Sequence, residues 1–278
     1  MVMRPDSPVQ SYAAPVARPA TVDVVDVPIA VIDYERTLRW IDAMVAERER
    51  GYVCVCNVHT VMASQEDPGL RTALLSSSLN VPDGQPIVWA LGALGHRLPD
   101  RVYGPELMAR ACARAAISGQ RFYLYGGRDQ DALIQLGTTL RRRFPGINIV
   151  GGYAPPFRTL SEEERVAVAE AINESEADVV WVGIGVPKQE KWMASLRPHL
   201  EAPVLVGVGA AFDFLADLVP QAPPMLQKAG LEWAFRLAQE PRRLWRRYLR
   251  YNPRFVAAFA RQLAAHRAAS EKPRFPNP

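Results

Sequence analysis

Short apolar runs alternate with longer amphipathic stretches along most of this chain. The runs occupy residues 52–56, 121–125, 147–153, 179–183 and 204–208, and segments with helical periodicity follow most of them. Strands that are apolar at nearly every position are typical of a parallel sheet with helices on both faces. The alternation therefore predicts a Rossmann-like α/β fold built on such a sheet.

The two ends of the chain lack this alternation. Residues 1–21 are rich in Pro, Ala and Ser and predict a disordered tail, and a second disordered tail is expected over residues 266–278. Between them we expect an α/β domain over residues 22–219 and a basic helical appendage over residues 220–265. No apolar stretch has the length of a membrane-spanning helix and no secretory signal is evident, so we expect no integral membrane protein.

Side chains that commonly hold metals are sparse. The three cysteines and four histidines lack the spacing of a zinc site, which favours reduced, packed thiols in a cytosolic setting. Asp129-Gln130-Asp131 resembles the Asp-x-Asp of metal-dependent sugar transferases. Its place at a predicted helix start favours a capping role instead. We therefore expect no metal cofactor.

Glycines follow three of the predicted strands, and ligands bind beyond the carboxyl ends of the strands in an open parallel sheet. They are Gly126 and Gly127, Gly183 and Gly185, and Gly207 and Gly209. Glycine lets backbone N–H groups approach a phosphate, although any one of these residues also suits a tight turn. Three such ends together favour a nucleotide-type ligand. The chain lacks both a complete Gly-x-Gly-x-x-Gly fingerprint and a Walker A loop.

Three polar residues stand out on the predicted loops. Gln189 and Asp213 have the groups to hydrogen-bond a uracil or a ribose, and each suits a helix cap equally well. Asp83 follows a turn and precedes the apolar run that begins at Ile87. A carboxylate at the start of a buried helix is desolvated, and its raised pKa then suits a general base. An ordinary Asp-Gly turn or a helix cap is the alternative for Asp83.

Arginines gather in the C-terminal appendage. On a helix, Leu244, Trp245, Tyr248 and Leu249 share one face, and Arg243, Arg246, Arg247 and Arg250 share another. Aromatic residues beside a cationic face are typical of a helix on anionic lipid, and such arginines also suit a diphosphate leaving group. A solvated basic face and a nucleic-acid patch are the alternatives.

Several motifs follow one another along the chain. They are Asn57 after the first core strand, Pro82-Asp83-Gly84-x-Pro86-Ile87-Val88-Trp89, Gly183-x-Gly185-x-Pro187-x-Gln189-Glu190-x-Trp192, Gly207-Val208-Gly209-Ala210-Ala211-Phe212-Asp213, Ala222-Pro223, and Leu231-Glu232-Trp233-x-x-Arg236-Leu237-x-x-Glu240-Pro241-x-Arg243. In the order and spacing of these motifs, the chain resembles the WecG/TagA/CpsF family of bacterial glycosyltransferases from about residue 25 to residue 263.

The resemblance implies an inverting, metal-independent transfer of a sugar from a UDP-sugar to a polyprenyl-diphosphate-linked saccharide. It implies that Asp83 is the general base and that Asn57, Gln189 and Asp213 line the donor pocket. The glycine loops would bind the UDP through Gly126, Gly127, Gly185 and Gly209. Arg236, Arg243 and Arg246 match family arginines that reach the diphosphates and the membrane, and we assign Arg247 to the same role.

Two departures from the family pattern leave the identity of the donor and acceptor open. Val55 stands where a Thr is frequent, and Gln221 stands where an Arg is frequent. Glucose is favoured, because Asp83-Gly84-x-Pro86 resembles the exopolysaccharide members, and N-acetylmannosamine and its uronic acid are the alternatives.

The resemblance also predicts where the protein works and with what. We expect a peripheral protein on the inner face of the cell membrane, in cell-surface or exopolysaccharide synthesis, with no nucleic-acid partner. Family members are often homo-oligomers, and the sequence leaves the oligomeric state open. A non-catalytic, membrane-peripheral nucleotide-sugar-binding protein is the alternative to the enzyme.

Overall fold

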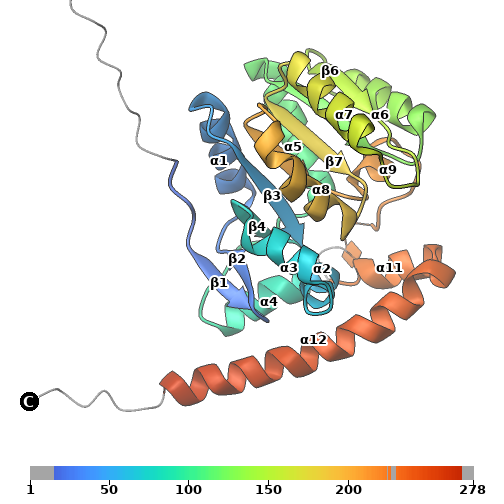
Figure 1. Ribbon diagram of the computed structural model, residues 1–278. Coiled ribbons are helices and arrows are strands. Elements are labelled where there is room, and N and C mark those ends of the chain that lie inside the picture. Colours follow the sequence, from blue (N-terminus) through green and yellow to red (C-terminus); the bar gives the residue numbers. More distant parts are fainter. Residues whose placement is uncertain (1–15, 224, 227–229, 271–278) are drawn as a thin grey trace, which may run out of the picture.

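The computed structural model describes residues 16–223, 225–226 and 230–270 (Figure 1). Its centre is a six-stranded sheet with the order β4-β3-β8-β7-β5-β6, and every neighbouring pair of strands is parallel. The strands are β3 (Gly51–Cys56), β4 (Leu79–Pro82), β5 (Arg121–Gly126), β6 (Asn148–Tyr153), β7 (Val179–Gly183) and β8 (Val204–Gly207). The predicted Rossmann-like parallel sheet is confirmed.

Helices cover both faces of the sheet, and each face has its own apolar core. One face carries α1 (Tyr34–Ala46), α5 (Gly104–Ser118), α6 (Gln130–Arg143) and α9 (Ala211–Leu215). The other carries α2 (Val58–Ser64), α3 (Pro68–Leu75), α4 (Gln85–Ala93), α7 (Glu162–Glu174) and α8 (Lys188–Leu196), which runs into η1 (Arg197–His199). Trp181 and Val182 are adjacent in β7 but belong to opposite cores, which is why the strand is apolar throughout.

The helix starts follow the local sequence signals. Asp129 caps α6, since its Oδ1 accepts a hydrogen bond from the Ala132 N–H at 2.8 Å. Ser161 and Glu164 form a capping box at the start of α7. The capping interpretation of Asp129-Gln130-Asp131 is therefore confirmed for Asp129.

An antiparallel hairpin of β1 (Thr21–Val24) and β2 (Val27–Ala30) precedes the sheet. Residues 16–20 of the expected N-terminal tail lead into this hairpin, and residues 1–15 lie outside the part of the chain that the structure describes. The last residue of the expected tail, Thr21, already belongs to β1.

The C-terminal appendage contains α11 (Glu232–Gln239) and α12 (Pro241–Ser270). Figure 1 shows α12 crossing below the α/β domain, and it lies against α2. The helix continues past the expected boundary at residue 265, because the alanine-rich sequence up to Ser270 favours helix. Residues 271–278 of the expected tail lie outside the described residues. In the part of the chain that the structure describes, no helix is both long enough and apolar enough to cross a bilayer.

Two anchors hold α12 on the α/β domain. Glu66, just after α2, pairs with both Arg250 and Arg254. Nearer its end, the Gln262 side chain accepts a hydrogen bond from the Val25 N–H at 2.8 Å and donates one to the Asp23 carbonyl at 2.5 Å in the β1–β2 hairpin. The appendage is thus fixed to the α/β domain at two well-separated places.

The single apolar face predicted for α12 is divided in the structure. Leu244 is 1% exposed, whereas Trp245 and Leu249 are 47% and 68% exposed. The difference follows from helical geometry, since Leu244 and Trp245 are neighbours and point about 100° apart. Trp245 and Leu249 therefore form an outward stripe of their own.

Candidate active site

Asp83 lies where β4 ends, beside the end of the parallel strand β3. Its backbone N–H donates to the Cys56 carbonyl at 2.8 Å, which continues the pairing of the two strands. Gly84 has a φ of 85°, and this left-handed residue turns the chain sharply into α4. The start of α4 has no side-chain cap. The helix-cap alternative for Asp83 is therefore wrong.

The Asp83 carboxylate is only partly satisfied. Its Oδ2 accepts a hydrogen bond from Asn57 Nδ2 at 3.2 Å, and its buried Oδ1 has no partner among the described residues. Asn57 is held in place because its own Oδ1 caps α2 at the Thr60 N–H. Burial raises the pKa of Asp83, and the Asn57 hydrogen bond lowers it only in part. A desolvated carboxylate with an unpaired oxygen has the properties of a general base.

Arg101 faces Asp83 and was not found by sequence reasoning. The next residue, Val102, donates its N–H to the Pro82 carbonyl at 2.7 Å, and this contact places Arg101 beside the end of β4. The Arg101 guanidinium lies over the Tyr103 ring, 4.4 Å from its centroid, and its charge lowers the pKa of Asp83. No motif marked Arg101, because its role arises from a contact between distant loops.

Side chains of the appendage complete a pocket around Asp83. It is lined by Asn57, Val58, His59, Asp83, Gly84, Gln85, Pro86, Arg101, Tyr103, Gly230, Glu232, Trp233, Arg236, Arg247, Tyr248, Tyr251 and Asn252. The structure thus brings together the predicted residues Asn57, Asp83, Arg236 and Arg247. Because the pocket is lined by residues of both the α/β domain and the appendage, neither part forms the site alone.

The four arginines predicted for diphosphate and membrane contacts take different places. Arg236 and Arg247 line the pocket, and the Arg236 guanidinium also lies 5.4 Å from the centroid of the Phe214 ring in α9. Arg246 is exposed and lies over Trp245, outside the pocket. Arg243 belongs to α12, and its side chain lies outside the described part of the structure.

His59 is a second pocket residue that sequence reasoning missed. Its ring stacks on Tyr251 of α12 with centroids 5.1 Å apart, and its buried Nδ1 has no hydrogen-bond partner among the described residues. Burial, assisted by the nearby Arg247 charge, lowers the pKa of His59 to about 3. The imidazole is therefore neutral at physiological pH and contributes no charge to the pocket.

The predicted glycine loops lie at the same carboxyl edge of the sheet, beyond β5, β7 and β8. Gly126, Gly127, Gly185 and Gly209 all have positive φ values, which explains why glycine occupies these four positions. A Cβ on Gly126 would lie 2.6 Å from the Gly183 carbonyl oxygen, so the backbones of two neighbouring strands approach closely there. None of these glycines lines the Asp83 pocket, so the edge contains two separate groups of predicted residues.

Gln189 and Asp213 are both engaged within the protein. Gln189 is 2% exposed, and its Oε1 accepts from the Gly185 N–H at 3.2 Å while its Nε2 donates to Glu190 Oε1 at 2.9 Å. Asp213 accepts from Arg128 Nε at 2.9 Å across the β5 and β8 loops. Gln189 therefore braces the glycine loop after β7, and Asp213 pairs with an arginine that follows Gly127.

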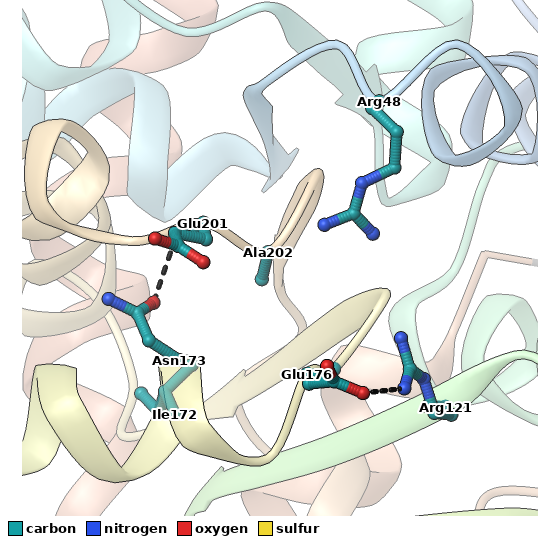
Figure 2. Close-up of a pocket in the computed structure, with 8 residues that line it drawn as sticks. Arg48, Arg121, Ile172, Asn173, Glu176, Glu201 and Ala202 are labelled. Carbon is teal, nitrogen blue, oxygen red and sulfur yellow. Dashed lines mark hydrogen bonds and ion pairs between the residues drawn. The ribbon is translucent and has the colours of Figure 1, made fainter.

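A second hollow lies at the opposite, amino edge of the sheet (Figure 2). Figure 2 shows Arg121 at the start of β5 paired with Glu176, and the Asn173 side chain bonded to Glu201. Ligands of open parallel sheets bind at the carboxyl edge, so this hollow is not the active-site candidate. The described residues also contain no group of three or more His, Cys, Asp or Glu that could hold a metal ion.

Comparison with known proteins agrees with this geometry. The sequence profile of the family described as glycosyl transferase WecG/TagA/CpsF matches residues 22–269. The N-acetylglucosaminyldiphosphoundecaprenol N-acetyl-beta-D-mannosaminyltransferase of Bacillus spizizenii is 29% identical over 232 residues, which cover 82% of this chain and 84% of that relative. The profile includes both the α/β domain and the two helices of the appendage. The chain belongs to the WecG/TagA/CpsF family of glycosyltransferases.

Proposed function

We propose that this glycosyltransferase moves a hexose or N-acetylhexosamine from a UDP-sugar to a saccharide linked to polyprenyl diphosphate. One observation carries the proposal: a desolvated carboxylate, Asp83, faces a pocket lined by Arg101, Arg236 and Arg247. A sugar hydroxyl needs a base, and two diphosphates need positive charge. The pocket supplies the base and the positive charge, and it lies next to the glycine loops at the carboxyl edge of the sheet.

Asp83 acts as the general base in a single displacement. Its carboxylate removes the proton from the acceptor hydroxyl while the hydroxyl oxygen attacks the anomeric carbon of the donor. The bond from the anomeric carbon to the UDP oxygen breaks, and UDP leaves with the electron pair. One displacement on the face opposite the leaving group inverts the anomeric configuration. Asn57 orients the carboxylate through its hydrogen bond to Oδ2.

The glycine loops bind the donor UDP. The positive φ values of Gly126, Gly127 and Gly185 turn backbone groups outward at the strand ends, and Gln189 holds the Gly185 loop in that shape. Arg236 reaches α9 beside this edge and is placed to stabilise the negative charge on the departing UDP. Arginines thus take the role that a metal ion has in other sugar transferases.

Two sugars are the leading candidates for transfer. The printed name of the Bacillus spizizenii relative supports N-acetylmannosamine and an acceptor of N-acetylglucosaminyl diphosphate undecaprenol. The Asp83-Gly84-x-Pro86 motif favours glucose and an exopolysaccharide product.

The outward stripe of α12 supports membrane association. Trp245, Leu249 and Val256 are four and seven residues apart, each is at least 47% exposed, and they share one side of the helix. The exposed arginines at positions 242 and 246 lie beside this stripe and suit anionic lipid headgroups. On this proposal, the enzyme lies on the cytoplasmic membrane face with the Asp83 pocket close to its lipid-linked acceptor.

Release of UDP tests the proposed function. UDP-glucose, UDP-N-acetylmannosamine and its uronic acid would each be incubated with the full chain, with and without a short polyprenyl-diphosphate N-acetylglucosamine or glucose acceptor. We expect release from one donor that depends on the acceptor. Tight binding of UDP with no release from any donor and acceptor pair would contradict a transferase and support a nucleotide-sugar-binding protein.

A further inference from the structure

Glu232 belongs to the appendage, but its carboxylate lies inside the Asp83 pocket. It is the first residue of α11 and is 7% exposed. It forms an ion pair with Arg101, in which both side chains are about nine-tenths buried. A buried ion pair between segments 131 positions apart is an unusual contact for a helix that otherwise lies on the outside of a domain.

Arg101 lies between two carboxylates and pairs with one of them. Its guanidinium bonds to Glu232, and no hydrogen bond or ion pair joins it to Asp83 among the described residues. Asp83 therefore keeps Oδ1 without a partner. An arginine and a carboxylate that share a pocket normally pair in a bidentate manner, which would occupy that oxygen.

We propose that Glu232 is a positioning residue, which holds the Arg101 guanidinium away from Asp83 so that Asp83 stays free to accept the proton of the acceptor hydroxyl. The proposal rests on the proposed function and adds a reason why the base works only with α11 in place. When α11 leaves, Arg101 turns to Asp83 and the base is blocked. The appendage then controls the reaction through an anionic residue as well as through its arginines.

The groups around Asp83 determine how this arrangement responds to pH. The charged and titratable groups around it come from six places: Arg101 and Tyr103 before α5, Glu232 and Arg236 of α11, Tyr34 of α1, Cys56 of β3, His59 of α2, and Arg247, Tyr248 and Tyr251 of α12. Burial raises the pKa of Asp83, Arg101 lowers it, and Glu232 raises it. A direct pair with Arg101 would lower the pKa further, because an opposite charge favours the carboxylate form.

The test is the pH dependence of kcat/KM for transfer by the full chain. Asp83 must be deprotonated, so activity rises with pH through its pKa. We expect Glu232→Gln to move this acid limb to lower pH and to lower the plateau rate by about tenfold, since a weaker base gives slower proton transfer. Glu232→Asp keeps the charge and should keep the limb near its wild-type position.

Two further variants distinguish the effect of the Glu232 charge from the effects of loosened appendage docking and of misfolding. Glu66→Gln loosens the appendage at the Arg250 and Arg254 anchor, whose three residues do not line the pocket, and should leave the acid limb in place. The double variant Arg101→Gln with Glu232→Gln removes the competing guanidinium and should return the limb to the wild-type position or above. It also removes the unpaired buried charge, so it remains informative if Glu232→Gln alone fails to fold.

Three outcomes would overturn the inference. They are an unmoved limb in folded Glu232→Gln, an equal movement of the limb in Glu66→Gln, and a double variant whose limb stays below the wild type. A wild-type chain without transfer activity on any donor and acceptor pair would instead contradict the proposed function. The two failures are therefore distinguishable.

Discussion

The glycine-rich edge of the sheet and the Asp83 pocket lie at the same end of the strands, but they are built differently. The edge is made of backbone, and its polar residues Gln189 and Asp213 are already engaged within the protein. The pocket is made of side chains from segments far apart in sequence, and Asp83 Oδ1 and His59 Nδ1 have no partners among the described residues. On the proposed function, the edge is a preformed binding surface and the pocket is where the chemistry takes place.

The largest expected effect is the loss of the base. Asp83→Asn should lower kcat by about 10³-fold, because general base catalysis contributes 10²–10⁴-fold, while UDP binding at the glycine edge stays unchanged. Steady-state rates and calorimetric UDP titrations measure the two parts separately. Near-native transfer by this variant would show that the pocket is not the catalytic region. A parallel loss of UDP binding would show that the two regions are not separate.

A comparison of two glycines tests the rigidity of the edge. A Cβ on Gly126 would clash with the Gly183 backbone at 2.6 Å, and its φ of 133° is unfavourable for other residues. Gly126→Ala should therefore lower the free energy of unfolding by about 3 kcal/mol. Gly185 has a φ of 79° and open space around it, so Gly185→Ala should cost only about 1 kcal/mol. Equal losses in urea unfolding would contradict the close approach of the two strands.

Substitution of two neighbouring arginines, Arg246 and Arg247, tests the outward stripe and the pocket separately. Arg247→Met should raise the KM for a short-chain acceptor by about tenfold, because a charge-assisted contact to the diphosphate is lost. Arg246→Met leaves the pocket intact and should instead weaken binding to anionic vesicles by about fivefold. The reverse pattern would place the acceptor diphosphate on the outer face of α12.

The smallest expected effect concerns Glu190, which lies fully buried beneath the glycine edge. Burial raises the pKa of Glu190 to about 7, and its Oε2 has no partner among the described residues. A carboxyl with a raised pKa keeps its proton in the folded state, so its contribution to stability falls as pH rises from about 4.5 through about 7. Glu190→Gln should remove this dependence and raise the free energy of unfolding at pH 8 by on the order of 1 kcal/mol. An unchanged pH profile of thermal unfolding would contradict it.

The sequence predicts the edge better than the pocket. Apolar runs that end in glycine directly encode parallel strands with open loops, so the sheet and Gly126, Gly127, Gly185 and Gly209 were placed correctly at its carboxyl ends. Asp83 and Asn57 were found through a motif, and the structure joins them by a hydrogen bond.

Residues that act through tertiary contacts were missed. Arg101 reaches the pocket through the backbone contact of Val102 with Pro82, which no local pattern encodes. His59 sits in the short helix α2, and its stacking on Tyr251 depends on how α12 docks. The predicted apolar face of α12 is divided between buried and exposed residues, because periodicity defines a face but not the neighbour that covers it.

The two anchors of α12 have a consequence for the length of the product. Glu66 and Gln262 fix the helix relative to Asp83, so the base stays at a constant height above any surface on which Trp245 and Leu249 rest. On the proposed membrane orientation, α12 then sets the distance between the membrane surface and the Asp83 carboxylate. Only a hydroxyl at one distance from the lipid diphosphate meets the carboxylate, and a saccharide longer by one sugar carries its terminal hydroxyl past it. Such an enzyme adds one sugar and releases its product to the next transferase.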